Sequence, residues 1–113
     1  MARTRIKICG ITRVEDALCA ADAGADAIGI NFFAASARAV TIDQALEISQ
    51  ALPPFVATVA LFVNPAPREV DEVIRRLRPA LLQFHGDETA AVCASFEFPF
   101  MKAIRVGSGM SSG

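Results

Sequence analysis

The sequence predicts an α/β fold in which parallel strands alternate with helices, and three observations carry this prediction. Runs rich in Ile, Val, Leu or Phe alternate along the chain with capped, amphipathic segments. Successive runs begin roughly 20–30 residues apart, the length of one strand, loop and helix. Each run also ends on polar residues, which places side chains capable of chemistry at one end of the predicted sheet.

Composition excludes several function classes. The chain has 113 residues, 11 Lys+Arg against 12 Asp+Glu and a net charge of −1, so it lacks the clustered positive charge that nucleic acid or an anionic membrane surface requires. Its hydrophobic content of 53% excludes a disordered chain. The longest apolar run, 55–63, is the length of a strand and too short for a membrane span. We therefore expect a globular protein.

The three cysteines indicate a reducing compartment. Their odd number, the absence of a CxxC motif and a single histidine argue against a disulfide framework or a zinc site. The basic start of the chain is not followed by a signal-peptide core, so the cytoplasm is the expected location. Cys19 and Cys93 fall within predicted helices and are expected to serve packing.

Five strands are predicted, and four helices connect them. The strands begin near Arg5, Asp26, Phe55, Ala80 and Phe100. In the connections, 12–15 and 41–44 are typical of capping boxes that begin the first and second helices. A proline at 67 suits the first turn of the third helix. The acidic pair 87–88 is expected to open a shorter fourth helix, which runs to about residue 95.

The polar strand ends distinguish two parallel architectures. In an open, doubly wound sheet, ligand-binding groups gather at one switch point, whereas in a TIM (β/α)8 barrel every strand contributes to a common mouth. All five strands end on polar residues, namely Cys9, Asn31, Asn64, Gln83 with His85, and Arg105. Because no glycine-rich nucleotide-binding motif follows any strand, the barrel is favoured further.

Chain length then limits how much of a barrel can be present. Eight βα units need at least about 200 residues. We therefore expect a partial TIM (β/α)8 barrel of about four βα units plus a fifth strand. Residues 1–106 are predicted to form the N-terminal half of the barrel, and 107–113 a Gly/Ser-rich tail or a truncated loop.

Several motifs resemble one enzyme family, the phosphoribosylanthranilate isomerases. The segment KICGIT at 7–12 is similar to a signature of that family. Further similarities follow in the family's order at 24–29 (GADAIG), 36–38 (SAR, with alanine in the place of a proline), 61–64 (LFVN), 82–88 (LQFHGDE) and 102–106 (KAIRV). The resemblance covers nearly all of this chain and the first half of the family's length.

The resemblance implies an Amadori rearrangement of N-(5'-phosphoribosyl)anthranilate, a step of tryptophan biosynthesis that needs a general base and a general acid. It implies no metal or organic cofactor. The family's general acid, an aspartate, and its phosphate-binding loops belong to the second half and have no counterpart here. The isolated chain is therefore expected to show little activity and to be complemented by the missing half.

The resemblance also assigns roles to four residues. Judged alone, Cys9 is typical of a packing cysteine and Arg38 of an exposed loop arginine; the resemblance makes Cys9 the general base and Arg38 the ligand of the anthranilate carboxylate. Gln83 and His85 share strand parity, so both are expected to point into the barrel near its mouth and contact substrate. A single histidine after an apolar strand is otherwise more often structural.

Lys7 has the parity of Cys9 and is expected deeper in the barrel, where its charge needs a partner that could lie in the missing half. Two function classes remain open. The first is the N-terminal part of an isomerase that acts on a small phosphorylated sugar–anthranilate substrate. The second is a non-catalytic half-barrel that self-associates or binds a partner through its uncovered edges. A different barrel enzyme acting on a sugar phosphate is a weaker third possibility.

Overall fold

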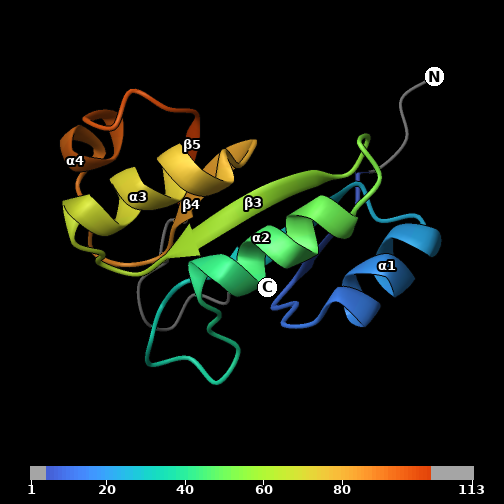
Figure 1. The fold of residues 1–113 in the computed structure, drawn as a ribbon. Helices are drawn as coiled ribbons and strands as arrows, with labels where there is room; N and C mark the ends of the chain where they lie inside the picture. Colours follow the sequence, from blue (N-terminus) through green and yellow to red (C-terminus); the bar gives the residue numbers. More distant parts are fainter. Residues whose placement is uncertain (1–4, 103–113) are drawn as a thin grey trace, which may run out of the picture.

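Strands and helices alternate throughout the computed structural model, which describes residues 5–102. The strands are β1 (Lys7–Cys9), β2 (Ala27–Asn31), β3 (Ala57–Phe62), β4 (Leu81–Phe84) and β5 (Phe100–Lys102), and the helices are α1 (Val14–Asp22), α2 (Ile42–Ala51), α3 (Pro67–Leu77) and α4 (Ala90–Ala94) (Figure 1). The predicted roles of Arg105 and of segment 107–113 lie outside the described residues.

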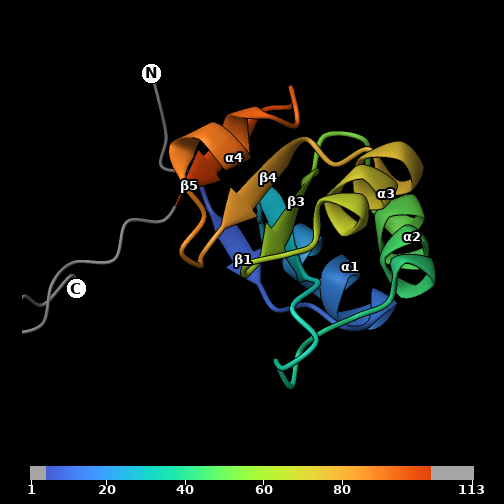
Figure 2. The ribbon, with the colours of Figure 1, turned by 90° about the vertical axis from the view of Figure 1, so that its left-hand side faces the viewer.

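The strand order confirms the barrel architecture. The five strands form one sheet in the order β1-β2-β3-β4-β5, and each pairs in parallel with the next strand along the chain. The helices lie around the outer side of this curved sheet (Figure 2). A doubly wound sheet would reverse its strand order at a switch point and carry helices on both faces. The described residues thus form part of a (β/α)8 barrel.

The register divides the strand residues between two faces. Ile28, Ala60 and Leu82 lie on the outer face and are fully buried against the helices. Four phenylalanine rings extend this core in a stacked series with centroid separations of 5.6, 5.9 and 5.9 Å, formed by Phe32, Phe62, Phe84 and Phe96. The core therefore sits between sheet and helices, and the inner face is left for the site.

Helix starts agree with the sequence in two cases and differ in two. Helix α2 begins with the predicted capping box between Thr41 and Gln44, and α3 begins at Pro67. The box predicted at 12–15 is wrong: Arg13 is the N-cap of α1 and makes no side-chain capping bond. Helix α4 begins at Ala90 behind the cap Thr89, because the acidic residue expected to open it is bonded elsewhere.

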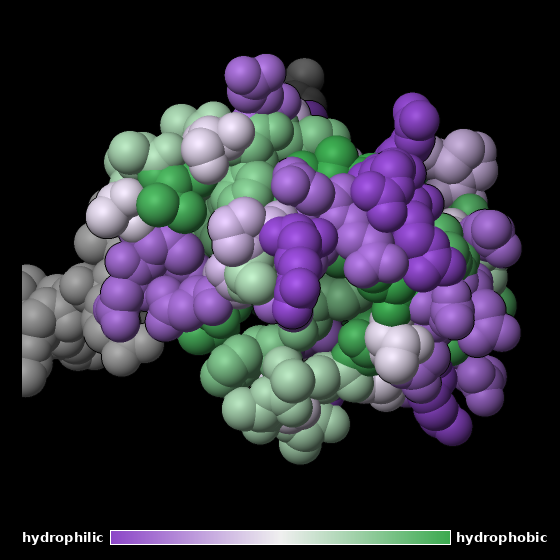
Figure 3. All heavy atoms as spheres, turned by 60° about the vertical axis from the view of Figure 1, so that its left-hand side comes forward, coloured by the Kyte–Doolittle hydropathy of each residue, from purple (hydrophilic) through white to green (hydrophobic). Residues whose placement is uncertain are grey.

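Polar and apolar residues are unevenly spread over the outside. On the side that includes the C-terminal ends of the strands, hydrophilic residues gather where α2 and α3 lie, and hydrophobic residues interleave elsewhere (Figure 3). Among residues 5–102, none of the helices has the length and apolar character needed to cross a membrane.

Candidate active site

Strand β1 brings Cys9 to the inner face beside the backbone of β2. Cys9 pairs in register with Gly29, and its thiol is exposed. A Cβ added to Gly29 would lie 3.0 Å from Cys9 Sγ and 3.0 Å from Leu61 Cδ1. The absence of a side chain at Gly29 thus makes room for the sulfur. An exposed thiol at a strand end is unlike the buried packing cysteine that spacing alone suggested.

Arg38 lies next to Cys9 because it covers the following residue. Gly10 has a φ of +81, in the left-handed backbone region that favours glycine. A Cβ added at Gly10 would lie 2.7 Å from Arg38 Cδ and 3.1 Å from Arg38 Nη1. The β1–α1 turn therefore gives the Arg38 side chain a bare backbone to lie on. The structure thus places the Arg38 side chain against the residue that follows Cys9.

Hydrogen bonds between residues close in sequence hold the loop that carries Arg38. Asn31 Oδ1 accepts from the Phe33 N–H at 2.8 Å, and Asn31 Nδ2 lies 3.3 Å from Ser36 Oγ. Ser36 Oγ also accepts from the Arg38 N–H at 3.1 Å. Asn31, predicted only as a polar strand end, thus organises this loop. Its hydrogen bonds constrain the loop at the position where the family that the sequence resembles has a proline and this chain has an alanine.

Gln83, His85 and Lys7 form a chain of side-chain hydrogen bonds. Lys7 Nζ donates to Gln83 Oε1, and Gln83 Nε2 lies 2.8 Å from His85 Nε2. Gln83 is 8% exposed and belongs to β4, whereas His85 directly follows that strand. Within the described residues, Lys7 therefore donates to an amide oxygen.

The surroundings of His85 disfavour its protonated form. Burial lowers the pKa of His85 below its usual value, and the positive charges of Lys7 and Lys102 lower it further, while Glu88 acts in the opposite direction. The imidazole is therefore expected to be neutral at neutral pH.

A cluster that sequence reasoning missed locks the loop after β4. The Glu88 side chain is only 3% exposed and accepts from Lys102 Nζ at 2.9 Å and from the Asn64 N–H at 2.7 Å. Lys102 also donates to the Gly86 carbonyl, and Asn64 Oδ1 accepts from the Asp87 N–H at 2.8 Å. Burial alone would raise the pKa of Glu88, but these hydrogen bonds hold it below its ordinary value. Asn64 has a φ of 45, in the left-handed region. Its side chain and its backbone N–H both bond to the loop after β4, so Asn64 organises this loop.

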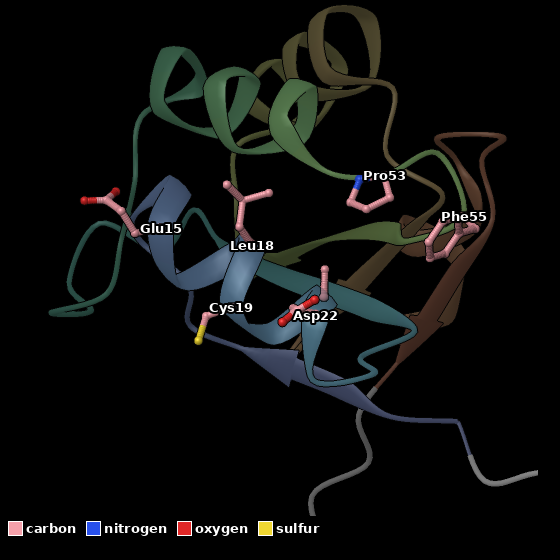
Figure 4. Close-up of a pocket in the computed structure, with 7 residues that line it drawn as sticks. Glu15, Leu18, Cys19, Asp22, Pro53 and Phe55 are labelled. Atoms are coloured by element: carbon pink, nitrogen blue, oxygen red, sulfur yellow. The ribbon is translucent and has the colours of Figure 1, made fainter.

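One surface hollow lies away from these residues. It has a volume of about 630 Å³ and lies between α1 and the residues that precede β3 (Figure 4). Leu18, Cys19 and Phe55 line it, and none of the predicted site residues does.

Cys19 is exposed, so its expected packing role is wrong, whereas Cys93 is buried as expected. Within 5–102, no group of three or more His, Cys, Asp or Glu is arranged to hold a metal ion.

Comparisons with known proteins identify the family of this chain. The sequence model described as N-(5'phosphoribosyl)anthranilate (PRA) isomerase matches residues 6–112. The N-(5'-phosphoribosyl)anthranilate isomerase of Pseudomonas fluorescens is 58% identical over 109 residues, which cover 96% of this chain and 53% of that protein. The chain spans about half the length of the curated relatives it matches.

Solved structures give the same result at the level of the fold. The phosphoribosyl anthranilate isomerase of Thermus thermophilus superposes with a TM-score of 0.87 at 35% identity, over 96% of this chain and 55% of that one. The enzyme of Thermotoga maritima gives 0.84 at 38% identity, over 88% and 50%. A third structure, bound to reduced 1-(o-carboxyphenylamino)-1-deoxyribulose 5-phosphate, gives 0.87 at 38% identity, over 93% and 55%. Because the family's sequence model matches nearly the whole chain, the chain belongs to the N-(5'-phosphoribosyl)anthranilate isomerase family.

Proposed function

We propose that this chain carries the base-bearing part of an active site that isomerises N-(5'-phosphoribosyl)anthranilate to 1-(2-carboxyphenylamino)-1-deoxyribulose 5-phosphate. The observation that carries the proposal is the exposed Cys9 thiol, seated beside bare Gly29 with Arg38 lying over the next residue. Family membership supports the reaction, and the relative bound to the reduced product supports the substrate class. The substrate is a small molecule, and a net charge of −1 gives no support to a nucleic-acid or membrane partner.

In this proposal Cys9 is the general base. In ring opening the nitrogen lone pair forms a C1–N double bond as the bond from C1 to the ring oxygen breaks and that oxygen takes a proton, which gives a protonated imine between C1 and the anthranilate nitrogen. The Cys9 thiolate then removes the proton from C2, the C2–H electron pair forms a C1–C2 double bond, and the imine π electrons move to nitrogen. The resulting enol-amine becomes the ketone product by proton transfer. The substrate imine serves as the electron sink, so the proposal invokes no metal or organic cofactor.

The other three predicted residues bind substrate. Arg38 has a planar guanidinium that suits bidentate binding of the anthranilate carboxylate, and its position over Gly10 supports this role. Gln83 and His85 supply polar contacts from the end of β4. The reaction also needs a general acid at the ring oxygen and a phosphate-binding element, neither of which the motifs of this chain provide.

The experiment transplants this chain into a complete relative. A chimera replaces the corresponding segment of the Pseudomonas fluorescens isomerase, which the chain matches at 58% identity. We expect the chimera to isomerise phosphoribosylanthranilate, and the change in fluorescence as the substrate is consumed measures the rate. Cys9→Ser should lower kcat by about 100-fold or more, because a serine hydroxyl is a far weaker base.

The matched control is Cys19→Ser, which changes an exposed thiol on α1 remote from the strand ends. We expect this variant to keep the rate of the parent chimera. A Cys9→Ser chimera with full rate would refute the base assignment, and an inactive parent chimera that folds would refute the function.

The cytosol is the compartment that suits this proposal. The base is an exposed free thiol, and a reducing compartment keeps such a thiol from forming disulfides.

A second candidate function, self-association or binding of a partner, is favoured by exposed apolar residues at the sheet edges, among them Ile8 and Met101. The dimeric state named for the Thermotoga maritima relative belongs to the same class of property.

A further inference from the structure

We propose that Lys7 and Gln83 are positioning residues that hold His85 as a neutral imidazole with its proton on Nδ1. Lys7 lies on β1, Gln83 lies on β4, and His85 is the residue directly after β4. The consequence for catalysis rests on the proposed function, whereas the tautomer itself is a property of the chain that can be measured without any substrate.

The polarity of the hydrogen bonds follows from Lys7. A lysine ammonium donates hydrogen bonds and cannot accept one, so the Gln83 atom that faces it must be the amide oxygen. The planar amide then directs its nitrogen toward His85 Nε2, 2.8 Å away. An amide nitrogen likewise only donates, so His85 Nε2 must accept. A ring nitrogen that accepts carries no proton, which places the single proton of the neutral ring on Nδ1.

Two members of this hydrogen-bonded series, Gln83 and His85, are held in place by other contacts. Gln83 is 8% exposed, and its backbone pairs in register with Leu61 on one side and Met101 on the other. The His85 backbone N–H donates to the Phe62 carbonyl at 2.9 Å. Burial leaves the Gln83 amide few other hydrogen-bond partners. A reversed amide would place its NH2 group against the Lys7 ammonium, and both groups are donors. The observed orientation is therefore the one that satisfies all three groups.

The charges around His85 act in the same direction as the relay. Lys7 on β1 and Lys102 on β5 disfavour a positive imidazole, Glu88 in the β4–α4 loop favours it, and burial together with the two lysines prevails. Protonation of Nε2 would also replace an accepted hydrogen bond with two opposed donors. The neutral form is therefore supported by both bonding and charge.

The consequence concerns the division of labour in the proposed reaction. With Nε2 occupied as an acceptor, His85 is not available as the proton-accepting base and instead offers substrate a donor through Nδ1–H. This leaves proton removal to Cys9. Lys7, which is partly buried, acts on the reaction through Gln83 and His85.

The test uses the only histidine of the 113-residue chain, so its imidazole signals need no assignment by mutation. Long-range ¹H–¹⁵N correlation spectra of the ¹⁵N-labelled chain, bound to the unlabelled C-terminal half of the Pseudomonas fluorescens isomerase, report directly which ring nitrogen is protonated. A pH titration of the same complex gives the pKa of His85. We expect a protonated Nδ1, an unprotonated Nε2 and a pKa below the ordinary value of 6.5. A dominant Nε2-protonated tautomer, or the mixture shown by a solvated histidine, would overturn the proposal.

Two variants test the relay itself. Lys7→Met removes the group that orients the amide, so the tautomer should return toward the Nε2-protonated form and the pKa of His85 should rise. Gln83→Glu keeps the shape but offers acceptors to both neighbours, so Nε2 should become a donor and the pKa should rise by about one to three units. Circular dichroism confirms that each variant is folded.

Arg5→Met is the matched control, since it removes an exposed positive charge just before β1 without touching the relay. It should leave the tautomer unchanged. An Nδ1-protonated ring that persists in Lys7→Met would refute the positioning role. The outcome is separable from the proposed function: an inactive chimera beside an Nδ1-protonated His85 contradicts the function alone, and an active chimera beside an Nε2-protonated His85 contradicts this inference alone.

Discussion

Glu88 shows how the role of a single residue depends on contacts that lie far along the chain. Its position after a strand and before a helix predicts a residue that favours the helix N-terminus. In the fold its carboxylate is buried between Lys102 and the backbone of Asn64, 14 and 24 residues away. The neighbouring thiol of Cys93 is also affected: its pKa is raised by burial first and by Glu88 second. The Glu88–Lys102 pair thus influences the titration of side chains near the β4–α4 loop.

Replacing Glu88 by Gln should destabilise the chain by about 1–3 kcal/mol, because a charge-assisted pair is lost and buried donors lose an acceptor. The pKa of Glu88 is depressed in the folded state, so its stabilisation is present above the ordinary pKa and is lost as pH falls through the folded value. Part of the acid-induced loss of stability below about pH 4.5 should therefore vanish in the variant. Urea unfolding of the chimera that carries each variant, followed by circular dichroism, measures both effects.

Glu72→Gln is the control for this prediction. Glu72 lies 3.8 Å from Arg76 on the exposed side of α3, and an exposed pair of this kind contributes at most about 1 kcal/mol. If the two variants lost equal stability with the same pH dependence, burial of the Glu88–Lys102 pair would not be the source of the effect.

At the scale of elements, two threonines with the same motif behave differently. Thr41 makes both bonds of a capping box with Gln44, at 3.1 and 2.8 Å, whereas the similar motif at Thr12 makes none because α1 starts one residue later behind Arg13. A capping motif in a sequence therefore predicts that a helix starts nearby, and the fold decides whether the cap forms.

Thr41→Ala should cost about 1 kcal/mol of stability, since the first turn of α2 loses its side-chain acceptor. Thr12→Ala should change stability by less than about 0.5 kcal/mol. Urea midpoints of the chimera with each of the two variants, compared under the same conditions, measure the difference. Equal losses would mean that Thr12 caps α1 in solution, contrary to the structure.

The sequence was sufficient for the order of elements and for the face on which Cys9, Gln83 and His85 lie. These features depend on local patterns: strand spacing, the alternation of side chains and polar strand ends. The Lys7–Gln83 contact joins residues 76 positions apart, and the Glu88–Lys102 pair depends on the register of β4 against β5. Local patterns do not contain such registers, so these partners became visible only in the fold.

At the scale of the whole molecule, sequential strand order leaves β1 and β5 at the two ends of the described sheet. Apolar side chains are exposed near both ends: Ile6 by 45%, Ile8 by 38% and Met101 by 43%. In a closed barrel these strands would each have a second neighbour, and relatives about twice as long have the residues to provide it. Unpaired strand edges with exposed apolar side chains promote association.

We therefore expect the chain alone to be oligomeric or loosely packed, and to form a one-to-one complex when mixed with the separately expressed C-terminal half of the Pseudomonas fluorescens relative. Sedimentation velocity measures both states. Ile8→Glu places a charge at the β1 edge and should weaken both kinds of association, whereas Phe55→Ser should not, because Phe55, though 81% exposed, precedes the central strand β3. If Phe55→Ser dispersed the oligomer and Ile8→Glu did not, the interaction surface would lie at the hollow lined by Phe55 and not at the sheet edges. A compact, cooperatively melting monomer that ignores the second half would contradict edge-driven association altogether, because such a chain would already have satisfied β1 and β5 by itself.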